Sequence, residues 1–288
     1  KEKTIQLLNK DQKLKDTEIG KQRVVRNYLI GVGLLILLLA LVLVRANKNK
    51  QKANEILTNQ KEEIVMQRDL IEAQKVVLEH QKKEITDSIN YAQRIQHAIH
   101  APVTEVKKYM PDSFIFYKPK DIVSGDFYWA HRIDDKFLIC AADCTGHGVP
   151  GAFMSLLNIS ILNEVTTEKR ITQPDKILNY VRDSIIVTLN TEGNEQSQDG
   201  MDCILCCFDL TNNKLQYAAA NNSFYIIRDG KLVMYTADKM PVGKSPRDQT
   251  PFTNHTIDLQ KGDVIYTLTD GYPDQFGGPK GKKFKYKT

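Results

Sequence analysis

Along the first hundred residues, the pattern of hydrophobic and polar positions predicts two helical segments of different character. The first, residues 28–44, has no charged side chain and is rich in Leu, Ile and Val, with Arg26 and Arg45 near its ends. As a helix this run spans about 25 Å, at the short end of what crosses a bilayer core. A signal peptide is the alternative, but a long, mainly polar stretch precedes the run. We predict a transmembrane helix at residues 28–44, after a polar juxtamembrane segment (residues 1–27) that ends a longer N-terminal region.

The second segment, residues 53–100, is polar and glycine-free, and it shows a repeat of seven. One heptad position is occupied by Leu57, Ile64, Ile71, Leu78, Ile85, Ala92 and Ile99. Gln side chains recur three residues later, so the apolar seam is weaker than one with two apolar positions per heptad. A solvated helix packed on its own domain is the alternative. Because the segment follows a membrane span, we predict a parallel dimeric coiled coil that transmits a signal.

From residue 111 onward the pattern changes to the short apolar runs of a globular domain (residues 111–288). Strands are predicted at residues 114–117, 127–133, 136–142, 203–210, 215–220, 224–228, 232–235 and 264–269. Helices are predicted at residues 152–165 and 174–189, and a polar loop at residues 191–198. Two blocks of strands separated by paired helices predict an α+β fold, in which a layered sheet sandwich is covered by helices.

Two of these strands form a hairpin whose ends carry an acidic pair. If the turn is centred between Asp134 and Asp135, positions whose numbers sum to 269 face each other, and Asp126 and Asp143 form such a pair. Their Cβ atoms would lie roughly 5 Å apart. Two carboxylates so placed repel each other unless a proton or a cation lies between them. The pair predicts a divalent metal site, with two solvated strand-end carboxylates as the alternative.

Asp270 is a third acidic residue at the end of an apolar strand. Strand-end carboxylates are rigidly held and open to solvent, as hard divalent cations require. Two Mg²⁺ or Mn²⁺ ions that share a carboxylate can hold a hydroxide and neutralise phosphate oxygens. No phosphate-binding loop or kinase signature is present in the sequence. The pattern therefore predicts metal-dependent hydrolysis of a phosphate ester.

Charge and cysteine usage narrow the choice of partners and compartment. The net charge is +5, but the first 52 residues hold 12 Lys/Arg and 4 Asp/Glu, which leaves 28 and 31 for the rest. The basic excess belongs to one short region and gives no reason to expect a nucleic-acid partner. Most of the five cysteines lie in apolar runs, which is typical of reduced, buried thiols in the cytosol. Their spacing argues against a zinc site.

Four motifs extend this interpretation: Ser-Gly-Asp-Phe-Tyr (124–128), Asp-Cys-Thr-Gly-His-Gly-Val-Pro-Gly-Ala (143–152), Tyr-Ala-Ala-Ala-Asn-Asn (217–222) and Thr-Asp-Gly-Tyr (269–272). In this order they resemble the bacterial PPM-type phosphatases, relatives of protein phosphatase 2C in the SpoIIE-like branch, over about residues 85–288. The resemblance implies an αββα sandwich, a centre of two Mn²⁺ or Mg²⁺ ions, and hydrolysis of phosphoserine or phosphothreonine in proteins. In this branch the substrates are often phosphorylated anti-sigma-factor antagonists.

The resemblance also implies roles for individual residues. Asp143 is expected to bridge both metals, and Cys144 to offer its backbone carbonyl to one of them. Asp126 is expected to be an acidic ligand, directly or through water, and Asp270 a ligand of the second metal. The family's last acidic ligand lies in an Asp-Asp element, and nothing after Asp274 supplies it. We therefore expect the domain to be truncated at its C-terminal end and to bind its second metal poorly.

Weaker signals surround this centre, and each has an alternative reading. His147 lies in a Gly-His-Gly turn and is either a general acid for the leaving group or a histidine that orients the turn. Lys118 and Lys120 could meet the substrate phosphate or could be solvated loop residues. Asp199 and Asp202 could lie near the metal or could form an acidic strand entry.

The sequence as a whole predicts a membrane-tethered, metal-dependent protein serine/threonine phosphatase in bacterial signal transduction. We expect a single-pass protein of the inner membrane, with its phosphatase domain in the cytoplasm. Its expected substrate is a phosphoprotein regulator, and its expected assembly a homodimer through the coiled coil. The alternative is a non-catalytic pseudo-phosphatase that binds a phosphoprotein or a regulator.

Overall fold

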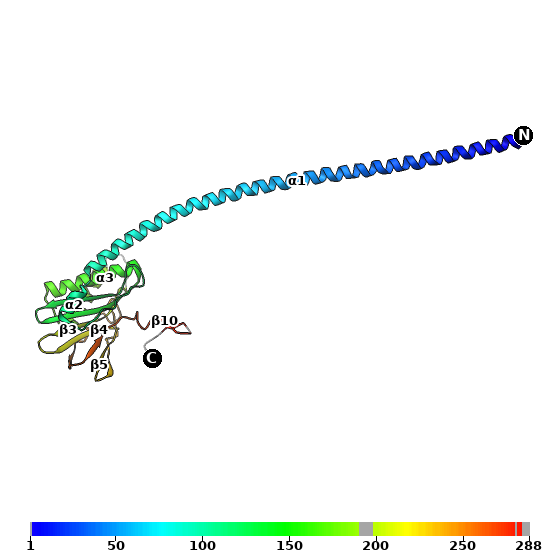
Figure 1. Ribbon diagram of the computed structural model, residues 1–288. Helices are drawn as coiled ribbons and strands as arrows, with labels where there is room; N and C mark the ends of the chain where they lie inside the picture. Colours follow the sequence, from blue (N-terminus) through cyan, green and yellow to red (C-terminus); the bar gives the residue numbers. More distant parts are fainter. Residues whose placement is uncertain (1, 190–197, 280, 284–288) are drawn as a thin grey trace. The chain divides into compact units, whose positions relative to one another are not determined.

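Helix α1 (Glu2–Ile99) occupies the N-terminal third of the chain (Figure 1). The computed structural model describes residues 2–189, 198–279 and 281–283. The chain divides into two compact units, Lys1–Gln81 and Lys82–Thr288, so the last turns of α1 belong to the second unit. The predicted membrane and coiled-coil segments are parts of one helix, because the sequence contains no proline before Pro102 to interrupt it.

The apolar side chains of α1 in the first unit are exposed. Leu35 and Leu57 are examples, at 72% and 64% exposure. By length and composition, α1 is the one helix in the described part of the chain that is apolar enough to cross a membrane. The predicted span lies on this exposed surface, as do the seam residues Leu57, Ile64, Ile71 and Leu78.

The second unit is built outward from the predicted hairpin. Strands β1 (Phe127–Ile133) and β2 (Lys136–Cys144) pair antiparallel, from Phe127 opposite Ala142 to Ile133 opposite Lys136. This is the predicted register, and the predicted turn is confirmed. Asp134 in the turn has a φ of 50°, a left-handed conformation that a short polar side chain tolerates.

Seven further strands join this hairpin to form two sheets. The first sheet has the order β1-β2-β3-β4-β8, with β7 paired to β3; its remaining members are β3 (Gly200–Asp209), β4 (Lys214–Ala220), β7 (Val242–Gly243) and β8 (His255–Asp258). The second sheet has the order β6-β5-β9 and consists of β5 (Phe224–Arg228), β6 (Lys231–Tyr235) and β9 (Val264–Tyr266). A short hairpin of β10 (Phe276–Gly277) and β11 (Lys282–Lys283) follows.

Strand alternation sends side chains of the first sheet into two separate cores. One core lies against α3 (Gly148–Asn163), the π-helical turn η1 (Glu164–Glu168) and α4 (Pro174–Leu189), and includes Leu138 and Leu205 of the sheet. The other lies between the two sheets and beneath α2 (Val103–Tyr109), and includes Ile204 and Phe224. Figure 1 shows α3 on one side of β3 and β4, with β5 on the other. The fold is therefore α+β, with a helix layer and two sheet layers.

Several predicted elements differ from the structure. Residues 114–117 have the sequence pattern of a strand but do not form one. Strand β9 is shorter than the strand predicted at residues 264–269. Helix α2 and strands β7 and β8 were missed, and the predicted loop 191–198 lies almost wholly outside the described residues. Phe153, in the predicted helix 152–165, is 67% exposed, whereas Trp129, in the predicted strand 127–133, is buried. Within the described ranges no helix covers the outer face of the second sheet, where Leu232 is 65% exposed.

The five cysteines confirm the prediction of reduced, buried thiols. All are free and buried: Cys140, Cys144, Cys203, Cys206 and Cys207. Cys206 lies in the core between the sheets, and the other four lie in the core beneath the helices. Burial raises the pKa of the Cys206 thiol to about 12, so this thiol stays protonated at neutral pH.

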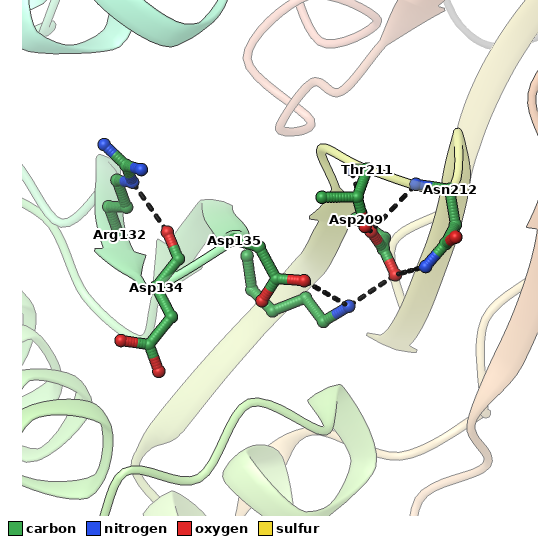
Figure 2. A network of polar contacts seen from close by, with 7 residues as sticks. Arg132, Asp134, Asp135, Asp209, Thr211 and Asn212 are labelled. Carbon is green, nitrogen blue, oxygen red and sulfur yellow. Dashed lines mark hydrogen bonds and ion pairs between the residues drawn. The ribbon is translucent and has the colours of Figure 1, made fainter.

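Polar contacts tie the two turns at one end of the first sheet (Figure 2). The Lys136 ammonium contacts the carboxylates of Asp209 and, at 3.6 Å, of Asp135. Asp209 also accepts hydrogen bonds from the backbone N–H groups of Thr211 and Asn212, both at 3.0 Å. The Lys136 contact is the main reason that the pKa of Asp209 is lowered. These contacts join residues that face each other across β2 and β3, and so support the register that places Asp143 opposite Asp202 at the other end.

Candidate active site

A cavity of about 210 Å³ lies where β1 begins and β2 ends. Asp126, Asp143 and Asp270, the three predicted carboxylate ligands, line it together. The other lining residues come from the loop before β1 and the turn before α3: Lys120, Asp121, Val123, Ser124, Gly125, Gly146, His147 and Gly148. A larger hollow of about 680 Å³ lies along α1 between Glu18 and Ile30, but residues of this one helix alone line it. The smaller cavity is therefore the candidate active site.

Each carboxylate reaches the cavity from a different element. Asp143 lies near the end of β2 and faces Asp202 of β3. Asp126 immediately precedes β1, so the hairpin register continued by one step places it opposite Asp143. Asp270 follows β9, and the neighbouring Thr269 Oγ1 donates to Asp126 Oδ2 at 3.3 Å. Segments far apart in sequence thus meet at one end of the two sheets.

The carboxylates raise one another's affinity for protons. Burial, followed by the charges of Asp126 and Asp270, raises the pKa of Asp143 to about 8. Burial is also the largest cause of the raised pKa of Asp126, to which Asp270 adds. The pKa of Asp202 is raised by burial as well, although the Asn221 amide that donates to it at 2.9 Å lowers it. Without a cation, these groups cannot all remain ionised at neutral pH.

Close backbone packing explains the glycines around the cavity. An ideal Cβ on Gly151 would lie 2.4 Å from Gly146 O and 3.0 Å from Gly125 Cα. An ideal Cβ on Gly125 would lie 2.7 Å from Gly146 O and 3.1 Å from Cys144 O. Gly146 itself has a φ of 89°, which disfavours other residues. The loop before Asp126 and the turn after Asp143 can therefore touch only because these positions lack side chains.

The donor set fits a hard divalent cation. The three carboxylates are oxygen donors of the kind that Mg²⁺ and Mn²⁺ prefer, and a cation would relieve the repulsion that helps to raise the pKa of Asp143. Cys144, expected to offer its backbone carbonyl, is not among the residues that line the cavity. In the described part of the chain, no group of three or more His, Cys, Asp or Glu side chains is arranged to hold a metal ion as it stands. Binding would therefore require the carboxylates to turn toward a common ion.

The weaker sequence candidates are placed differently from one another. His147 lines the cavity, and its Nδ1 lies 3.3 Å from Asp121 Oδ2, although its side chain is 83% exposed. Lys120 lines the cavity, whereas Lys118 is exposed and does not. Asp202 faces Asp143 across β2 and β3, and the charge of Asp270 also acts on it.

Sequence reasoning missed three residues that support the site. Asp121 pairs with His147, and Tyr117 donates its hydroxyl to the backbone oxygen of Asp126 at 3.2 Å. Gln96 of α1 is buried and bonded to Ser124. Gln96 is one polar residue among many in a helical pattern, so nothing in the sequence marked it as buried.

The sequence and the fold of this chain are similar to those of known proteins. The family model "Stage II sporulation protein E (SpoIIE)" matches residues 133–287. The solved SiaA-PP2C domain of Pseudomonas aeruginosa is 30% identical, with a TM-score of 0.63, over 71% of this chain and 79% of that one. The PP2C phosphatase domain of SpoIIE from Bacillus subtilis, solved with a fragment of its regulatory domain, is 19% identical, with a TM-score of 0.45, over 54% of this chain and 44% of that one.

The RsbU and RsbW domains of a Mycobacterium tuberculosis protein are 20% identical, with a TM-score of 0.47, over 56% of this chain and 43% of that one. These last two similarities are too distant to support an argument about the site. No curated protein matches the chain. The SpoIIE match covers more than half of the residues, and the SiaA-PP2C match covers most of both chains. The chain therefore belongs to the SpoIIE family, and its second unit is a PP2C-type phosphatase domain.

Proposed function

We propose that the protein is a membrane-tethered, metal-dependent protein serine/threonine phosphatase that acts on a phosphoprotein regulator. The observation that carries this proposal is the convergence of Asp126, Asp143 and Asp270 in one cavity, where burial and mutual repulsion raise the pKa of Asp143. Membership of the SpoIIE family supports the reaction class. A phosphorylated anti-sigma-factor antagonist is the substrate class that the motif resemblance implies.

The carboxylates provide the negative charge that would hold two Mn²⁺ or Mg²⁺ ions. The charges of both Asp126 and Asp270 act on Asp143, so Asp143 is the best placed of the three to be shared by two ions. Asp126 and Asp270 would each be a further carboxylate ligand of the ions, and the Cys144 carbonyl would be a further oxygen donor. When bound, the ions would lower the pKa of a coordinated water and polarise the substrate phosphate.

The remaining polar residues of the cavity suit the phosphate and the leaving group. Lys120 can balance the charge of the incoming phosphate, and its place in the cavity makes it better situated than Lys118. His147 can donate a proton to the serine or threonine oxygen as the P–O bond breaks. Asp121 would orient the His147 ring through Nδ1.

The exposed apolar run of α1 supports the membrane anchor. Residues 28–44 are uncharged and exposed, and basic residues follow from Arg45 to Lys52. The exposed heptad positions further along α1 support a parallel homodimer. We place the phosphatase domain in the cytoplasm, because five free thiols suit a reducing compartment.

A non-catalytic module remains the second candidate. The observation that favours it is that, among the described residues, no cluster of three or more His, Cys, Asp or Glu side chains is arranged to hold a metal ion as it stands. Such a module would use the same cavity to bind a phosphoprotein without hydrolysing it. Catalysis separates the two candidates.

The test is Mn²⁺-dependent hydrolysis of p-nitrophenyl phosphate and of a phosphoserine peptide. We expect Asp143→Asn and Asp270→Asn each to lower kcat at least 100-fold, because each removes a carboxylate from the centre. Asp258→Asn is the matched control, since this carboxylate lies on β8 and is 85% exposed. Equal activity in the wild type and both site variants would reject the assignment. Metal-independent phosphopeptide binding without hydrolysis would support the second candidate.

A further inference from the structure

Gln96 is the one buried side chain among the described residues of α1, at 3% exposure. Its Nε2 donates to Ser124 O at 2.7 Å and to Ser155 Oγ at 2.8 Å. Its Oε1 accepts from Ser124 N at 3.1 Å. A buried amide needs hydrogen-bond partners, and here both ends of the amide have them. The bonds therefore fix both the rotamer of Gln96 and the groups to which it binds.

The contact with Ser124 is a two-point contact with the backbone. Gln96 pairs with both the N–H and the C=O of a single residue, as a neighbouring β-strand would. Two bonds at one residue prevent the peptide groups on its two sides from rotating independently. Ser124 lies two positions before Asp126, so its orientation sets the direction in which the chain enters β1.

Gly125, between Ser124 and Asp126, transmits the constraint on the Ser124 backbone by direct packing. Gly125 is so close to the turn after β2 that an added Cβ would lie 2.7 Å from Gly146 O and 3.1 Å from Cys144 O. Interiors packed this closely pass on shifts of a few tenths of an ångström. A displacement of Ser124 would therefore move both Asp126 and the Cys144 carbonyl.

The same segment is held at two further points. Ser155 of α3 receives the second Gln96 bond, and its Oγ lies 2.9 Å from Ala152 O and 3.3 Å from Ser124 O. Tyr117 donates to the Asp126 backbone oxygen at 3.2 Å. The bonds of Ser155 to Ala152 and Ser124, and of Tyr117 to Asp126, do not involve Gln96. The fold should therefore survive the loss of Gln96, while the position of the segment changes.

We propose that Gln96 is a positioning residue for the metal centre: it sets the backbone of Ser124 and Gly125 so that Asp126 and the Cys144 carbonyl face the same cation. The inference rests on the proposed function, because it takes those two groups as metal ligands. A purely structural role would instead affect only the stability of the fold. The two roles differ in the metal affinity of the folded protein.

The test uses the full chain in detergent micelles and the variant Gln96→Met, which preserves the side-chain size but removes all three hydrogen bonds. Mn²⁺ affinity is measured calorimetrically without substrate, and kcat and KM are measured with a phosphopeptide. We expect the dissociation constant for Mn²⁺ to rise at least tenfold and kcat to fall at least tenfold, with KM within about twofold. Unchanged Mn²⁺ affinity would overturn the proposal.

Thr166→Val is the matched control. Thr166 is fully buried in η1, away from the cavity, and its Oγ1 donates to Leu162 O at 2.6 Å. This variant should lower the melting temperature and leave Mn²⁺ affinity and kcat unchanged. If it weakens Mn²⁺ binding as much as Gln96→Met does, the effect is one of general stability and the proposal fails.

A milder variant covers the case in which Gln96→Met does not fold. Ser155→Ala removes one of the three Gln96 bonds, together with the bond from Ser155 Oγ to Ser124 O, and leaves both bonds between Gln96 and Ser124 in place. It should weaken Mn²⁺ binding about threefold, and an unchanged affinity would again count against the proposal. Failure of the proposed function gives a different result from failure of the Gln96 proposal alone. A wild type that binds no Mn²⁺, or an Asp143→Asn variant that binds Mn²⁺ as well as the wild type does, overturns both the proposed function and the role of Gln96.

Discussion

Replacing Asp143 by Asn should stabilise the metal-free protein while abolishing its activity. The pKa of Asp143 rises from its ordinary 3.8 to about 8, mainly through burial and then through Asp126 and Asp270. Between these two values, the folded state binds a proton that the unfolded state does not bind. The contribution of Asp143 to the stability of the metal-free wild type is therefore fully present below about pH 4 and is lost as the pH rises toward 8. Asparagine carries no charge at any of these pH values and avoids the loss.

The size of the effect follows from the shift. At pH 8 about four pKa units correspond to about 5 kcal/mol of destabilisation of the wild type. Asp143 is only partly buried, and screening by solvent reduces this to about 2 to 3 kcal/mol. For a domain of this size, the gain corresponds to a melting temperature about 5 to 10 °C higher in the variant.

The assay is thermal unfolding of wild type and Asp143→Asn in EDTA at pH 5 and pH 8. Comparing the two proteins at each pH cancels the contributions of other titrating groups. The variant should gain most at pH 8 and less than half as much at pH 5. Added Mn²⁺ should raise the melting temperature of the wild type but not of the variant. A variant that is no more stable than the wild type at pH 8 in EDTA would refute the reasoning.

Two further predictions concern other parts of the second unit. His100 is buried, and burial, aided by the charge of His97, lowers its pKa to about 4. Since the unfolded chain takes up this proton near pH 6.5, stability in urea should fall by up to about 3 kcal/mol between pH 6.5 and 4. His100→Phe should lose that dependence, and an unchanged profile would contradict it. Gly151→Ala should cost more than about 2 kcal/mol and weaken Mn²⁺ binding, because its Cβ would meet Gly146 O at 2.4 Å. Gly277→Ala, with nothing within 4 Å, is the control, and equal melting temperatures of the two variants would count against the packing argument.

The hairpin was predictable because its information is local. The alternation of apolar positions and the Asp134-Asp135 turn fix the register by themselves, and the register brings Asp126 and Asp143 together. Asp270 was found because it follows an apolar run, but its place beside the other two depends on how the second sheet packs on the first. The placement of Asp270 beside Asp126 and Asp143 was expected from the motif resemblance.

The errors have a common physical cause, which is that partners distant in sequence decide the outcome. Residues 114–117 have a strand pattern, but a strand exists only where another strand pairs with it, and none of the described strands does so. Phe153 is a large apolar residue of the predicted helix 152–165 and yet is exposed. Gln96 is the reverse case, a polar residue buried by tertiary contacts that no helical periodicity reveals.

The buried cysteines turn β2 and β3 into a natural reporter of opening motions. Cys140 and Cys144 lie on β2, and Cys203, Cys206 and Cys207 on β3, so both central strands and both cores carry thiols. A thiol reagent needs access to the sulfur atom, and burial in the folded sheet denies that access. Labelling in native buffer therefore proceeds only through molecules whose sheet has opened, and its rate measures that opening. If Cys206 is modified as fast as the cysteines beneath the helices, the sheet opens as a unit; if more slowly, the helix layer lifts first.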